Sequence, residues 1–332
     1  MRRKGSRWLL GGLTVTIAIL ALVSLAIGPA PLAPQDVWRA VVGGEKEVAA
    51  LIVLEVRLPR TILALMTGAT LGLAGAALQG FLRNPLAEPG LIGVSASAAF
   101  GAVLTFYTGM AAWFSLALPL GGMAGAVAGV LLVQALAGRG GSALTLILAG
   151  IAVSAFAGAL TSLVLNFAPN PFAALEIVFW LMGSLADRSM EHVWLAGPFM
   201  LAGWIVVLSS GRPLAALTLG EEATASLGFN LGQVRTSLVL GTALSVGAAT
   251  AVAGAIGFVG LVVPHLLRPL VGERPSALLP ASALGGGAML LLADIAVRAF
   301  SPAQELKLGV LTALVGAPFF LFLIVRLRRE LL

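Results

Sequence analysis

Long apolar stretches separated by short polar breaks run through the whole chain. Each is close to the length that a helix needs to cross a bilayer, roughly 20 residues. The predicted spans cover residues 8–28, 61–82, 91–108, 113–137, 143–168, 193–210, 234–254, 255–270, 278–300 and 308–326. The seventh and eighth run together, so their boundary is the least defined. The pattern predicts an all-α integral membrane protein with about ten transmembrane helices.

Small residues recur at four-residue intervals within two of these spans. They are Gly68, Gly72, Ala76 and Gly80 in the second span and Gly121, Gly125 and Gly129 in the fourth. Helix faces of small residues let two backbones approach closely. The pattern indicates tight packing within the bundle, with sliding surfaces of a moving transporter as the alternative.

Composition agrees with a membrane chain and excludes several kinds of site. Of the 332 residues, 59% are hydrophobic and 10% are charged, whereas soluble domains have about 25% charged residues. No polar segment is long enough to fold separately, so we expect one membrane domain over residues 1–332. Cysteine is absent, which excludes disulfides and thiolate metal sites. His192 and His265 are too few for a metal cluster.

Basic residues at both ends predict the orientation. The chain begins MRRKGSRW and ends RLRRELL, and basic flanks mark the cytoplasmic side. With both termini in the cytoplasm, thirteen basic residues fall on that side and seven on the other. The net charge of +6 therefore reflects orientation and does not point to nucleic acid. The first stretch also has features of a signal peptide, but the proline-rich GPAPLAP after its long run favours a retained span.

The stretch FLRNPLAEPGLIGVS, residues 81–95, interrupts the apolar pattern. Pro85 and Pro89 stop a helix, and Gly90 and Gly93 let the chain turn. Irregular backbone at a membrane edge needs water or a protein cavity beside it. We interpret the stretch as a tight cytoplasmic turn, for which an ordinary connector is the simplest alternative.

The sequence RLPRTILALMTGATLGLAGAALQGFLRNPLAEPGLIGVSASAAFGAVL, residues 57–104, carries a strong resemblance. It resembles the permease subunit of type II ABC importers for iron–siderophore complexes, haem and cobalamin, the FecCD/BtuC-type permeases. GAIGFVGLVVPHLLRPLVGE, LLLADIAVRAF and ELKLGVLTALVGAPFFLFLI are similar to the C-terminal half of that family, in the same order. Lys307 departs from the family, which usually has proline there. The resemblance implies a BtuC-like permease fold.

Residues 209–235 form the most polar connection on the predicted cytoplasmic side. Acids in a first turn and a glycine stop indicate a short helix outside the bilayer, although an idle loop or an interfacial segment fits as well. The resemblance implies that this loop, about residues 211–233, holds the coupling helix that docks on an ATPase subunit. The residues assigned to it are Gly220, Glu221, Glu222, Ala223, Ala225, Leu227 and Gly228.

The chain lacks a phosphate-binding loop of the form G-x-x-x-x-G-K-[ST]. We therefore expect a transport subunit without catalytic residues or cofactors of its own, with ATP and Mg²⁺ bound by a separate chain. The resemblance further implies a homodimer with two ATPase subunits and one periplasmic binding protein. It also implies a place in the bacterial inner membrane.

Arg57, Arg60 and Arg298 lie on the less basic, external side. Anchoring at the membrane interface explains them from the sequence alone. The resemblance implies that they pair with glutamates of the binding protein. Asp294 precedes Arg298 by four residues, which predicts an ion pair on one helix face near the external surface, with a proton relay as the alternative.

Residues 166–194 are too interrupted for a plain span, and they resemble the short external helix that shapes the permease mouth. Asn170-Pro171 predicts the start of that helix. Its apolar stripe, which internal packing would explain equally well, consists of Phe172, Leu175, Phe179 and Met182.

The resemblance also implies two cytoplasmic gates on a substrate path along the dimer axis. The first falls at Asn84 and Leu86, in the turn over residues 81–95. The second, which aligns poorly, falls at Ser142, Ala143 and Leu144.

Two other functional classes share part of this pattern. An ion-coupled secondary transporter would also have many spans and interrupted helices, but it should show charged sites at mid-depth, which are few here. A membrane-embedded enzyme would need a nucleophile or paired acids, and Ser154, Ser162 and Asn166 are the nearest candidates. The sequence does not define the cargo. An iron chelate (siderophore or haem) is preferred as the commoner family cargo, with cobalamin close behind.

Overall fold

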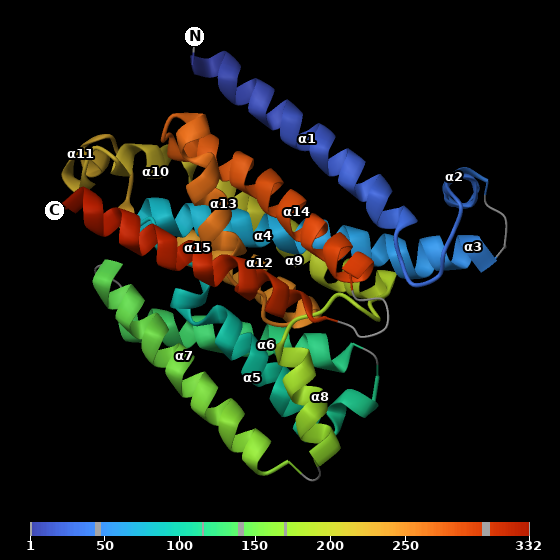
Figure 1. The fold of residues 1–332 in the computed structure, drawn as a ribbon. Helices are drawn as coiled ribbons and strands as arrows, with labels where there is room; N and C mark the ends of the chain where they lie inside the picture. Colours follow the sequence, from blue (N-terminus) through green and yellow to red (C-terminus); the bar gives the residue numbers. More distant parts are fainter. Residues whose placement is uncertain are drawn as a thin grey trace.

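The chain folds into a bundle of helices, shown in the computed structural model of Figure 1. The structure describes residues 2–43, 48–114, 116–138, 143–168, 171–300 and 306–331. The longer helices are α1 (Arg2–Ala26), α4 (Leu58–Leu82), α5 (Val94–Tyr107), α6 (Ala117–Ala137), α7 (Ala143–Asn166), α9 (Met190–Ser209), α12 (Leu231–Ala253), α14 (Pro275–Phe300) and α15 (Leu308–Leu331). The shorter ones are α2 (Pro34–Val42), α3 (Val48–Leu51), α8 (Pro171–Leu181), α10 (Gly211–Leu217), α11 (Glu221–Ser226) and α13 (Val259–Leu267). Between them lie a π-helical stretch, η1 (Ile52–Arg57), and the 3-10 turns η2 (Pro89–Ile92), η3 (Met110–Ala112) and η4 (Pro269–Val271).

The predicted all-α membrane fold is confirmed. By length and composition, seven helices in the described part of the chain can cross a membrane: α1, α6, α7, α9, α12, α14 and α15. α4 adds 25 residues, most of them buried, and α5 is shorter, with 14 residues. These helices correspond to nine of the ten predicted spans.

The span predicted for residues 255–270 is wrong in extent. α12 ends before Gly254, which has a φ of 73°, and the next helix, α13, has only nine residues. Phe258, at the start of α13, also has a left-handed backbone, with a φ of 67°. Apolar composition does not distinguish a buried non-helical segment from a helix, so the sequence pattern could not reveal this break.

α4 lies in the middle of the bundle, in contact with α9, α12, α13 and α14. Its small-residue face meets α14 backbone to backbone: a Cβ added at Gly68 or Gly72 would overlap the carbonyl oxygen of Gly286 or Ser282. The glycines of α6 face α5 just as closely. The predicted tight packing is therefore confirmed for both glycine patterns.

The two ends of the bundle carry different short elements. In Figure 1 both termini lie at the same end as α10 and α11, whereas α2 and α3 lie at the opposite end. α1 runs along the outside of the bundle and contacts α14. This arrangement separates two surfaces, one near the termini and one near α2 and α3.

The sequence analysis missed α2, although the signals for it were present. Pro34 stands at its start and Asp36 lies in its first turn, both typical of a helix N-terminus. Trp38 and Val42 are exposed on it. The helix is short and amphipathic, so it does not register in a search for long apolar spans.

α8 begins at Pro171 as predicted, and Asn170 lies outside the described residues. Its apolar stripe is not packed inside this chain, because Phe172 is 82% exposed and Phe179 is 51% exposed. Internal packing therefore does not explain the stripe. This face is left for lipid or for another chain.

We expect Gly72→Ala to destabilise the protein, because the new methyl group would overlap the Ser282 oxygen and force α4 from α14. Overpacking of this kind costs about 1–3 kcal/mol. The measurement is the thermal unfolding of the purified chain in detergent. Gly80→Ala is the matched control: on the same helix its Cβ would meet Leu214 at 3.6 Å, an ordinary contact. Equal melting temperatures for the two variants would contradict the close approach.

Candidate functional site

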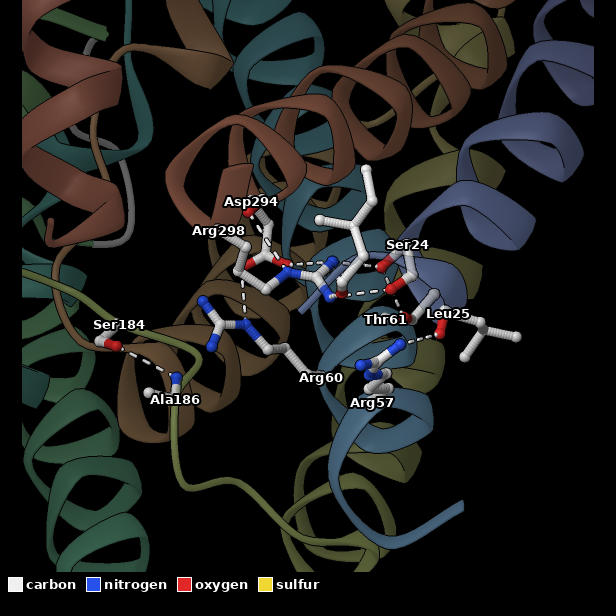
Figure 2. Close-up of polar contacts among 10 residues, drawn as sticks. Ser24, Leu25, Arg57, Arg60, Thr61, Ser184, Ala186, Asp294 and Arg298 are labelled. Carbon is white, nitrogen blue, oxygen red and sulfur yellow. Dashed lines mark hydrogen bonds and ion pairs between the residues drawn. The ribbon is translucent and has the colours of Figure 1, made fainter. Parts of the chain in front are cut away.

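A buried polar cluster joins the end of α1 to α4 and α14 (Figure 2). Asp294 of α14 is fully buried, and its carboxylate pairs with Arg60 Nε at 2.8 Å and with Arg298 Nη2 at 2.9 Å. The predicted pair between Asp294 and Arg298 is confirmed, and Arg60 of α4 joins it. Ser24 of α1 completes the cluster through a hydroxyl contact of 2.7 Å with Thr61.

Arg57 and Arg298 cap the end of α1. Arg57 donates a hydrogen bond of 2.8 Å to the carbonyl oxygen of Leu25. Arg298 donates to the carbonyl oxygen of Ser24 at 2.8 Å and to its hydroxyl oxygen at 2.6 Å. The last carbonyl groups of a helix have no partner within the helix, and positive charge there is favourable. The guanidinium groups thus supply the donors that α1 lacks.

The three arginines predicted to dock a binding protein differ in their accessibility. Arg57 is 3% exposed and Arg298 is 7% exposed, and both are held by the end of α1. The side chain of Arg60 is more open, at 15%. This burial could not be predicted from the sequence, because Arg57 and Arg298 contact residues that lie 32 and 274 positions away. Docking by these residues stays a prediction.

At the opposite end, the loop between α9 and α12 contains a short, well-defined helix. α11 starts after Gly220, with a φ of 112°, and is followed by Gly228, with a φ of 86°. Thr224 is fully buried, and its hydroxyl donates to the Gly220 oxygen at 2.6 Å. Glu221 and Glu222 lie in the first turn and are exposed. The predicted helix with acids at its start is therefore present, and it contacts α10 and α12.

A hollow of about 540 Å³ lies between α11 and the turn after α4. It is lined by Arg83, Leu219, Gly220, Glu221, Glu222 and Ala223. Ala225 is exposed on the same helix, and Leu219 and Leu227 are exposed apolar side chains beside it. A concave surface that combines charged and apolar side chains is suited to contact with another protein.

The turn after α4 is built as the sequence predicts, but it extends further into the bundle. Arg83 ends α4 with a φ of 48°, and the Asn84 side-chain oxygen accepts from the Leu86 N–H at 2.9 Å. The chain then runs back so that Leu91 contacts α7 at Gly150, where a Cβ would overlap the Leu91 oxygen. Gly150 lies seven residues into α7, or about 10 Å along it. The stretch over residues 81–95 is therefore a turn that re-enters the bundle, not a turn confined to its edge.

The second predicted gate is described only in part. Ser142 lies outside the described residues, and Ala143 begins α7. Leu144 follows in the first turn of α7 and is 63% exposed. Its side chain is free to meet a neighbouring surface.

Within the described ranges, no three histidine, aspartate or glutamate side chains gather as metal ligands do. Asp294 instead pairs with two arginines, Arg60 and Arg298.

The whole bundle has a close counterpart among solved structures. It matches a structure described as an inward-facing conformation of a metal-chelate type ABC transporter with a TM-score of 0.86 and 35% identity. The match covers 96% of this chain and 99% of that one. Residues 16–326 match the FecCD transport family. The chain belongs to this family.

Full-length relatives agree with the family assignment. The hemin transport system permease protein HmuU of Yersinia pestis is 38% identical, over 98% of this chain and 97% of that protein. The vitamin B12 import system permease protein BtuC of Salmonella typhi is 37% identical, over 99% of this chain and 98% of the relative. An ABC transporter permease of Bacillus subtilis, YvrB, is also 37% identical, over 94% and 92%. This FecCD protein is thus a multi-pass membrane permease, and the predicted family and fold are confirmed.

We expect Arg298→Met to lower the melting temperature of this permease in detergent. The substitution removes one of the two partners of Asp294 together with the Ser24 contacts, and each lost hydrogen bond to a charged group costs about 1.5–3 kcal/mol. Arg212→Met, at an exposed position on α10, should stay within about 0.5 kcal/mol of the parent. If the two variants unfold alike, the cluster does not anchor α1.

Proposed function

We propose that this FecCD permease is the translocation subunit of an ATP-driven importer in the bacterial inner membrane, with both termini in the cytoplasm. The observation that carries the proposal is α11, a short helix with exposed acids that contacts α10 and α12 at the end of the bundle where both termini lie. A rigid surface helix can pass a movement of an attached motor to α10 and α12 beside it. A flexible loop could not transmit that force.

In this proposal two ATPase subunits bind ATP and Mg²⁺ and dock on the α11 surface. The contact residues are Gly220, Glu221, Glu222, Ala223, Ala225, Leu227 and Gly228. The adjoining hollow of about 540 Å³ reaches Arg83, at the start of the gate turn. α11 and the gate turn therefore line the same hollow, so that a movement of α11 would act directly on the turn.

A second copy of the chain would complete the path. α8 and α15 present large apolar side chains outward, including Phe172 and Phe322, the latter 62% exposed. Lipid covers part of such surfaces, and a partner copy along one axis would cover the rest. Two copies of Asn84 and Leu86 would then close the inner end of the path, together with the loop that ends at Ser142, Ala143 and Leu144.

A periplasmic binding protein would deliver the cargo to the end opposite α11. Arg60 is the most open of the three predicted docking arginines. Direct contact by Arg57 and Arg298 would require them to leave the end of α1. We therefore propose that Arg60 makes the contact with a carboxylate, while Arg57 and Arg298 hold the surface in shape.

The names of the relatives point to haem and vitamin B12 as cargo, and we propose an iron chelate, as siderophore or haem, or cobalamin for this chain. The test is uptake into vesicles that contain the permease with its ATPase and binding protein. Ferric siderophore, haem and cobalamin are compared side by side. Uptake that continues without ATP and stops when the proton gradient collapses would overturn the proposal in favour of an ion-coupled carrier.

We expect the double variant Glu221→Gln/Glu222→Gln to uncouple ATP hydrolysis from uptake. Loss of both charges removes the exposed acids that would meet the motor subunit. Uptake should fall at least about tenfold, the loss of roughly 1.4 kcal/mol in coupling, while the permease stays folded. Glu273→Gln is the matched control, an exposed acid outside α11. Uptake at the parental rate in the double variant would contradict the role of α11.

We expect Arg60→Gln to weaken the stimulation of ATP hydrolysis by the binding protein more than it weakens folding. Arg298 still pairs with Asp294 in this variant, so the carboxylate keeps one charged partner. The measurements are the half-maximal binding-protein concentration and the melting temperature of the same sample. A large drop in melting temperature with unchanged stimulation would assign Arg60 to the cluster alone.

A further inference from the structure

Glu88 forms a long-range contact that the proposed function does not use. Its carboxylate oxygen Oε1 accepts a hydrogen bond of 2.7 Å from the backbone N–H of Phe258. The two residues are 170 positions apart in the sequence. Glu88 lies two residues after Leu86, so the contact ties the proposed gate turn to the break before α13.

The Glu88 carboxylate lies at the N-terminal end of α13, where a hydrogen-bond acceptor is favourable. Phe258 precedes the first residue of α13, and its own oxygen accepts from the N–H groups of Leu261 and Val262 at 3.1 and 2.8 Å. The first N–H groups of a helix have no partner within it, and negative charge at that end is favourable. Without the carboxylate, the Phe258 N–H would be left unpaired inside the bundle, which is costly.

The contact is partly buried between helices. Gly260 of α13 would, with a Cβ, meet the Pro89 ring and the Leu71 oxygen of α4, each at 2.8 Å. A Cβ at Gly75 of α4 would in turn overlap the Gly260 oxygen. Gly75 precedes the end of α4 by seven residues, about 10 Å. The Pro89 ring thus packs on Gly260, so the segment after Glu88 lies directly against α13.

α13 in turn contacts α15. The side chain of Phe258 occupies the space over Gly316, where a Cβ would overlap it. Further along, the His265 ring meets Phe319 edge to face, with ring centres 5.7 Å apart. A continuous row of contacts therefore runs from the gate turn through Glu88 and Phe258 to α15.

We propose that Glu88 is a positioning residue for the cytoplasmic gate, which it holds to the start of α13 so that the two move together. This inference rests on the proposed function, because it takes Asn84 and Leu86 as the gate. A shift of α13 or α15 pulls the turn along, since parting would break a 2.7 Å hydrogen bond to a carboxylate in a partly buried site. The hydrogen bond is thus a mechanical link and not a ligand site.

The test uses the absence of cysteine from the chain. Leu86→Cys introduces a single thiol at the gate. The rate at which this thiol reacts with a maleimide is followed by mass spectrometry of the permease chain. The rate is measured in the complete complex with ATPase and binding protein, once without nucleotide and once trapped with ATP and vanadate. The ratio of the two rates reports how far the gate responds to the motor.

With Glu88 intact, we expect the labelling rates with and without trapped nucleotide to differ clearly, so that their ratio is well away from one. Glu88→Ala should bring it to within about twofold of one and lower uptake about tenfold or more, because a hydrogen bond to a charged group is lost. Glu88→Gln keeps an oxygen acceptor of the same reach and should restore most of the ratio. Glu273→Ala, which removes an exposed acid, should leave both unchanged. If Glu88→Ala does not assemble, Glu88→Asp, one methylene shorter, takes its place with the same expectation.

An unchanged ratio and unchanged uptake in Glu88→Ala would overturn the proposal and leave the gate assignment intact. Equal losses in Glu88→Gln and Glu88→Ala would overturn the role of the shared oxygen acceptor. If the Leu86→Cys parent transports cargo but its labelling does not respond to nucleotide, the gate assignment itself fails and this inference fails with it.

Discussion

Backbone polar groups that end inside a membrane bundle must find partners within the protein, because water is not at hand. This chain meets the requirement at several helix ends with charged side chains from distant segments, including the ends of α1 and α13. Arg57 and Arg298 satisfy the carbonyl groups at the end of α1, and Glu88 satisfies the N–H at the start of α13. Each charge has the sign that its helix end favours. The same constraint accounts for why these side chains are buried in so apolar a protein.

Close packing of α4 on α14 makes the first of these arrangements possible. Glycines let the two backbones touch, and the contact brings Arg60 of α4 within 2.8 Å of Asp294 on α14. α1, α4 and α14 thereby form one tightly connected unit. α1, α7 and α15 also carry apolar side chains that face outward, such as Val15, Phe156 and Phe322.

Much of this architecture could be predicted from the chain alone, for identifiable reasons. Apolar length predicted most of the spans, four-residue glycine spacing predicted the α4 contact, and i to i+4 spacing predicted the pair of Asp294 and Arg298. Pairings across long sequence separations could not be predicted, since Glu88 gives no local sign that its partner is Phe258. The break before α13 was hidden because its residues are as apolar as a helix. Burial of Arg57 and Arg298 was hidden because their acceptors are carbonyl oxygens of α1, which any sequence would supply.

The capping of α1 has a consequence for biosynthesis. α1 leaves the ribosome before α14, and Arg298, which fastens its last turn, follows Ser24 by 274 residues. Until the translocon has released α14, the final carbonyl groups of α1 lack one of their two guanidinium partners. α1 is therefore secured only after α14 has been made, and a chain truncated before α14 would hold α1 loosely in the membrane.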